Sequence, residues 1–153
     1  MTAVLLLLLH GLAGIALLGV LTHQAVASRA APPPVAKGFL GRYAGVAAAV
    51  FVRPVLVLFP LVTLLGALLY PAYRLDVRIP LEEMRLGWAI GLFELKEHTV
   101  ALGLFLLPLY AAAWSGDAAG PATGLRAATT RLLAGIAWFA RDSRGRAQWR
   151  SAP

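Results

Sequence analysis

The chain has 153 residues, of which 59% are hydrophobic and 14% are charged, with a formal net charge of +7. A soluble domain carries about 25% charged residues, so this composition indicates an integral membrane protein whose apolar surface is covered by lipid. The sequence contains no cysteine, which excludes disulfides, iron–sulfur clusters, c-type haem attachment and thiolate zinc sites.

The basic residues lie mostly between apolar segments and in a carboxyl-terminal tail over residues 141–153. Basic residues in such places are typical of loops that stay on the cytoplasmic side and face anionic lipid headgroups. We therefore expect the lipid bilayer to be the partner of this positive charge, and we expect no nucleic acid.

Residues 1–28 contain no Asp, Glu, Lys or Arg, and a helix over 2–27 would exceed the roughly 20 apolar residues that cross a bilayer. A cleaved signal peptide is the alternative, because Ala25, Val26 and Ala27 resemble a small-residue cleavage site. However, no basic segment precedes the apolar run, and the run exceeds the roughly 7–15 residues of a signal-peptide core. We expect a retained first span.

The next two spans are predicted over about 45–73 and 86–114. Three consecutive prolines, residues 32–34, make 28–42 an extended connection, and Pro54 and Pro60 could begin or kink the second span. The mixed charges of 74–85 predict a polar loop between these two spans.

A fourth segment, about 122–140, carries Arg126 and Arg131 but has apolar residues at helical spacing. It could cross the membrane or lie along its surface as an amphipathic helix, and we expect a crossing. The fold class is then all-α, a single transmembrane domain over 1–153 built as a four-helix bundle. The Lys and Arg counts of the connections and the tail place both termini in the cytoplasm, in a prokaryotic-type inner or plasma membrane.

The third span contains four ionisable residues within five positions: Glu94, Lys96, Glu97 and His98. Ionisable groups in hydrocarbon cost about 2.5–3.5 kcal/mol each and usually face protein, a cofactor or water. At about 100° per residue, Glu94 and His98 share one helix face with Gly91, and Lys96 points nearly the opposite way. We expect Glu94 and His98 to face the bundle interior and to mark the functional site.

All three histidines, His10, His23 and His98, fall in predicted spans. Counted from the helix starts at about 1.5 Å per residue, His10 and His98 lie at similar depth, and His23 lies near the opposite membrane face. Gly14 and Gly91 lie near these two histidines and could leave room for a flat macrocycle between the helices, although such residues also permit plain helix contact.

In these residues the chain resembles the small four-helix membrane cytochromes of b type, in which histidines on different helices clamp haem. The resemblance implies an electron-transfer protein, or a redox-complex subunit, with one haem b between His10 and His98. Arginine matches carboxylates well, so Arg53, Arg126 or Arg131 would neutralise the propionates. The thirteen-residue separation of His10 and His23 differs from the fourteen of diheme cytochromes, so two stacked haems on the first helix are not expected.

Two other functions remain open. The short chain has no complete catalytic set, so it could be a non-catalytic accessory subunit of a larger membrane complex and not an enzyme by itself. Glu94, Glu97 and His98 could instead form a proton or ion path, with Lys96 and His23 as further buried polar groups. A quinone or a lipid could also occupy the groove assigned to haem.

Overall fold

The protein is helical wherever its structure is described. This computed structural model describes residues 2–28, 38, 43, 46–116 and 122–142, and all of their regular secondary structure is helical. Three of the helical segments are long and apolar enough to cross a membrane: Ala3–Ala27, Ala48–Glu83 and Gly87–Ser115. The expected all-α class is thereby confirmed, together with membrane-length helices at the first three predicted spans.

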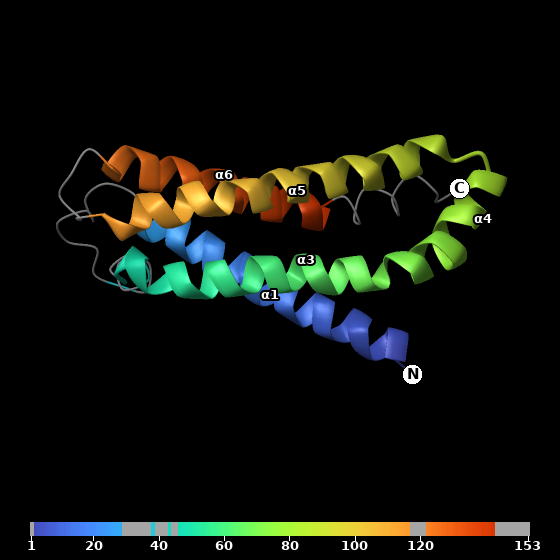
Figure 1. Cartoon of the computed structure of the whole chain (residues 1–153), viewed down its shortest axis with the longest axis horizontal. Coiled ribbons are helices and arrows are strands. Elements are labelled where there is room, and N and C mark those ends of the chain that lie inside the picture. Colours follow the sequence, from blue (N-terminus) through green and yellow to red (C-terminus); the bar gives the residue numbers. More distant parts are fainter. Residues whose placement is uncertain (1, 29–37, 39–42, 44–45, 117–121, 143–153) are drawn as a thin grey trace.

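Seven elements follow one another along the described chain (Figure 1). They are α1 (Thr2–Ala27), η1 (Ala48–Phe51), α3 (Val52–Tyr73), η2 (Arg74–Arg78), α4 (Ile79–Glu83), α5 (Gly87–Ser115) and α6 (Ala122–Asp142). The η2 element is a π-helical turn, and α3, η2 and α4 form one continuous 36-residue helical segment together with η1.

The predicted polar loop over 74–85 is wrong, because the helix continues to Glu83. This segment contains no glycine, and its single proline, Pro80, lies in the first turn of α4, where a missing N–H costs little. The chain reverses only over residues 84–86, where Arg85 adopts a positive φ of 57°. The second and third membrane-length segments are therefore joined by a very short turn.

The four long helices pack around one core. α1 lies against α3 and α6, and α5 lies against α6 and α3, so α1 and α5 face each other diagonally (Figure 1). Each helix supplies two residues to the buried cluster, which comprises Leu17, Leu21, Val55, Phe59, Leu107, Tyr110, Leu133 and Ala134. The core therefore draws on all four helices.

The closest helix approach in this core is between α3 and α5 at Gly103. A Cβ atom at this position would overlap the ring of Phe59, which is 2% exposed. Glycine is therefore required where α5 crosses Phe59. The amino-terminal half of α1 slants away from α5 and α6 (Figure 1), so the core lies toward the other end of the molecule.

Candidate functional site

The ionisable stripe of α5 lies on the outer face of this helix. Glu94 and His98 are about 180° and 140° around the helix axis from Gly103, which is buried. His98, Gly91 and Ala101 are exposed, and Phe105 on the same stripe is 82% exposed. The predicted stripe thus exists as one face, but it faces outward, whereas the sequence analysis expected Glu94 and His98 to face the interior.

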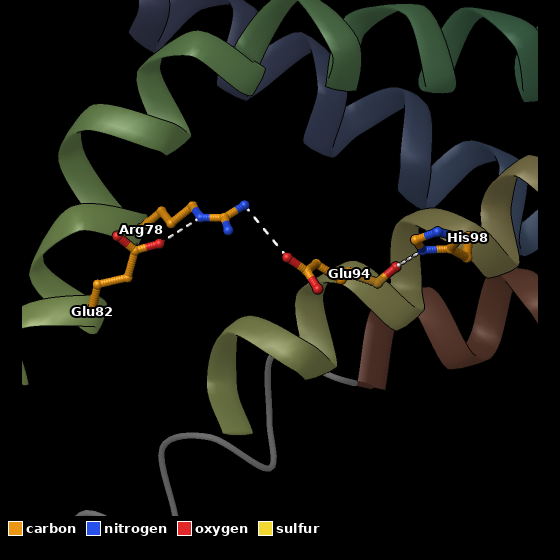
Figure 2. Close-up of polar contacts among 4 residues, drawn as sticks. All are labelled: Arg78, Glu82, Glu94 and His98. Atoms are coloured by element: carbon orange, nitrogen blue, oxygen red, sulfur yellow. Dashed lines mark hydrogen bonds and ion pairs between the residues drawn. The ribbon is translucent and has the colours of Figure 1, made fainter. Parts of the chain in front are cut away.

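A cluster of polar contacts links this face of α5 to the turn region at the end of α3 (Figure 2). The Arg78 Nε donates to Glu82 Oε1 at 2.8 Å, and the Arg78 Nη1 lies 3.4 Å from Glu94 Oε1. His98 donates its Nδ1–H to the main-chain oxygen of Glu94 at 2.7 Å, since a carbonyl oxygen can only accept. Glu94 is therefore paired with Arg78.

Aromatic rings lie beside these charges. Tyr73 of α3 stacks on Phe93 of α5 with ring centroids 3.7 Å apart, and Lys96 Nζ lies 4.3 Å from the Phe93 centroid. Lys96 and Glu97 are half-buried, on the sides of α5 that turn toward the neighbouring helices. These contacts hold the first turns of α5 against the end of α3. A proton path through Glu94, Glu97 and His98 stays a prediction.

His10 belongs to α1 and packs against α3, at the level of the polar cluster on α5. Its Nδ1–H donates to the main-chain oxygen of Val62 at 3.1 Å, and a Cβ at Gly66 would lie 3.2 Å from its Cε1. Two contacts align α3 with α5: Phe59 meets Gly103, and Tyr73 meets Phe93. Gly66 is midway between Phe59 and Tyr73 on α3, and His98 is midway between Phe93 and Gly103 on α5. His98 and His10 therefore both lie near the level of Gly66 along the helix axes.

The residues predicted to hold haem are not brought together. His10 contacts α3, whereas His98 is exposed on the outer face of α5. Arg53 and Arg131 are exposed, and an added Cβ at Gly14 or at Gly91 would meet nothing within 4 Å. Among the described residues no group of three or more His, Cys, Asp or Glu could hold a metal ion. The haem stays a prediction that the structure leaves open.

Two other predicted residues take part in contacts at the opposite end of the molecule. His23 donates its Nε2–H to the main-chain oxygen of Tyr43 at 2.6 Å and stacks on the Tyr43 ring at 3.7 Å. Arg126 is buried and donates to the main-chain oxygens of Ala113 and Gly116 at the end of α5. The Arg126 contacts satisfy carbonyl groups at the carboxyl-terminal end of α5, where the helix dipole favours a cationic group.

Sequence reasoning missed the buried polar network of the core. Tyr110 donates its OH to Gln24 Oε1 at 2.7 Å, Gln24 donates to the Ala48 oxygen at 3.1 Å, and both side chains are 0% exposed. Trp114 donates to Thr130 Oγ1 at 3.3 Å, one layer away. Gln24 was the available signal, because an uncharged amide within an otherwise apolar helix usually hydrogen-bonds to another helix.

Comparison of the chain with protein-family models, with curated proteins and with solved structures gave no match. Two features of the chain's own geometry bear on its function: a closed polar network inside the core and an exposed polar stripe on α5.

Proposed function

We propose that this protein is an integral membrane protein and a non-catalytic subunit of a larger membrane complex, which it joins through the exposed face of α5. The observation that carries the proposal is the outward orientation of His98 on a membrane-length helix, one turn deeper than Glu94. Ionisable residues within such helices almost always face protein or water, because exposure to lipid is costly. A neighbouring subunit would remove that cost.

In the proposed membrane placement, the depth of these residues follows from the helix lengths. The 36-residue segment Ala48–Glu83 is about 54 Å long at 1.5 Å per residue, against about 30 Å of hydrocarbon. Tyr70 and Tyr73 then mark the aromatic belt at one interface, and η2 and α4 project beyond it. His98, level with Gly66, lies about 6 Å inside the level of Tyr70, where a lipid-facing imidazole is disfavoured.

The shape of the same face suits a helix–helix contact. Gly91 and Ala101 flank the polar pair, and small residues let a second backbone approach closely in lipid. Phe105 extends the face toward the other membrane surface as a large apolar side chain. In this proposal the turn after α4 and the carboxyl-terminal tail lie on the cytoplasmic side, in keeping with their arginines, and four crossings put the amino terminus on the same side.

Photo-crosslinking in native membranes tests this proposal. A photo-reactive phenylalanine replaces Phe105 on the outer face of α5, and the same residue replaces Leu64, which is exposed on α3, in a control. We expect one protein adduct of defined mass from position 105 and lipid adducts from position 64. Ala101→Leu should abolish the adduct, whereas Ala67→Leu, an equally exposed change on α3, should preserve it. Lipid adducts alone at both positions would overturn the proposal.

Haem binding is a second candidate, favoured by the tautomer of His98. His98 donates its Nδ1–H to a main-chain oxygen, so in the neutral ring the Nε2 atom carries the lone pair that iron requires. Oxidised and dithionite-reduced visible spectra of the purified protein test this candidate. A reduced α band that disappears in His98→Ala would support a haem at the outer face of α5, and a colourless protein expressed with added haem would dismiss it.

A further inference from the structure

A pocket lies on the helical extension beyond the aromatic belt. It has a volume of about 300 Å³ and is lined by Pro71, Arg74, Leu75, Arg78, Ile79 and Glu82. The π-helical turn Arg74–Arg78 forms its centre and places two guanidinium groups and two aliphatic side chains on one surface. The pocket is connected to the outer face of α5 through Arg78, which lines the pocket and pairs with Glu94.

The charges in the pocket are not balanced. Arg78 is held by two carboxylates, Glu82 at 2.8 Å and Glu94 at 3.4 Å. Both ion pairs found among the described residues involve Arg78, so Arg74 has no carboxylate partner there. Arg74 is also exposed. Among the lining residues two arginines stand against one carboxylate, that of Glu82, so the lining carries a formal charge of +1. Glu94 pairs with Arg78 from α5 but does not line the pocket, which leaves Arg74 as the arginine available to an anion.

The position of the pocket selects the kind of anion. The lining begins at Pro71, directly after Tyr70, so in the proposed membrane placement the pocket lies at headgroup level on the cytoplasmic side. The cytoplasmic leaflet is rich in anionic phospholipids, and the guanidinium fork matches a phosphate group. Leu75 and Ile79 provide apolar contact for the glycerol region and the first carbons of an acyl chain.

We propose that this pocket binds the phosphate of an anionic phospholipid through Arg74, with Arg78 oriented beside it by Glu82 and Glu94. The inference rests on the membrane insertion contained in the proposed function, but not on the partner subunit.

Native mass spectrometry of the detergent-purified protein tests the inference by titration with phosphatidylglycerol and, separately, with phosphatidylcholine. We expect wild-type protein to bind phosphatidylglycerol more tightly, and Arg74→Gln to weaken that binding about fivefold, the usual effect of one arginine at an anionic surface. Arg85→Gln is the matched control, because Arg85 is an exposed arginine at the same end that does not line the pocket.

Each outcome decides the question. Equal loss in both variants would mean that the preference follows overall charge, and no loss in either would remove the site; both results overturn the inference. Displacement of bound phosphatidylglycerol by millimolar inorganic phosphate would assign the pocket to free phosphate. Carbonate extraction of cell membranes separates the two proposals: if the protein is released, the membrane placement fails, whereas a retained protein with an unaffected Arg74→Gln variant defeats only the lipid site.

Discussion

The two ends of the molecule use polar residues in opposite ways. At the core end, four helices surround Gln24 and Tyr110, whose side chains are fully buried and bonded to each other. At the other end, α1 diverges, and Glu94 and His98 lie on an outer surface, where Arg78 pairs with Glu94 (Figures 1 and 2).

This difference separates residues that hold the fold from residues that remain available to partners. A buried amide without its hydrogen bond costs stability, so the Gln24–Tyr110 pair specifies how the helices align. An exposed ion pair such as Arg78–Glu94 contributes little to stability. Charge within an apolar helix is therefore a sign of function only when the structure does not already satisfy it inside the core.

The strongest test of the core end is Gly103→Ala. The new methyl group would overlap the buried ring of Phe59, and overpacking of this kind costs about 1–3 kcal/mol. Equilibrium unfolding of the detergent-purified protein measures the loss. Gly91→Ala, in the same helix but with no neighbouring atom within 4 Å, is the control and should be neutral or slightly stabilising. Equal effects of the two changes would contradict the observed α3–α5 contact.

A smaller loss is expected from Tyr110→Phe. Removal of the hydroxyl leaves the buried Gln24 oxygen without its donor, which costs about 1–3 kcal/mol in unfolding free energy. Because this change creates no steric overlap, we expect the loss to be smaller than that of Gly103→Ala. The double variant Gln24→Leu/Tyr110→Phe should recover part of this loss, because no unpaired amide remains. Tyr70→Phe, near the open end, serves as control; a loss there as large as in the core would erase the contrast between the two ends.

The smallest effect on stability is expected from Glu94→Gln and His98→Ala at the open end. Both side chains are partly or fully exposed, so the unfolding midpoint should not change measurably. The same variants should reduce the partner adduct from position 105 if the outer face of α5 binds a subunit. A marked drop in the unfolding midpoint would show that these residues support the fold instead.

Much of the helical architecture could be predicted from the sequence. Long apolar runs placed helices over 2–27 and 86–114, close to the observed Thr2–Ala27 and Gly87–Ser115. The loop prediction over 74–85 failed because charge was read as a break in the helix. Arginine and glutamate are good helix formers, and only the turn at Arg85 reverses the chain.

The orientation of α5 could not be predicted for a different reason. Helical periodicity correctly grouped Glu94, His98 and Phe105 on one face, but small and apolar residues occur on both faces of this helix. Two contacts between distant parts of the chain determine which face of α5 is buried: the packing of Phe59 on Gly103 and the hydrogen bond from Tyr110 to Gln24. No local pattern contains that information.

One hydrogen bond has a consequence for the order of assembly. Trp138 of α6 donates to Thr22 of α1 at 3.0 Å, across 116 positions of sequence. Contacts between near neighbours in the chain form early and distant ones late, so the α3–α5 hairpin with its short turn should form first. The α6 side of α1 is then covered only after α6, the last helix described, has packed. A chain shortened before Ala122 should therefore leave α1 held by α3 and by the Gln24–Tyr110 hydrogen bond to α5.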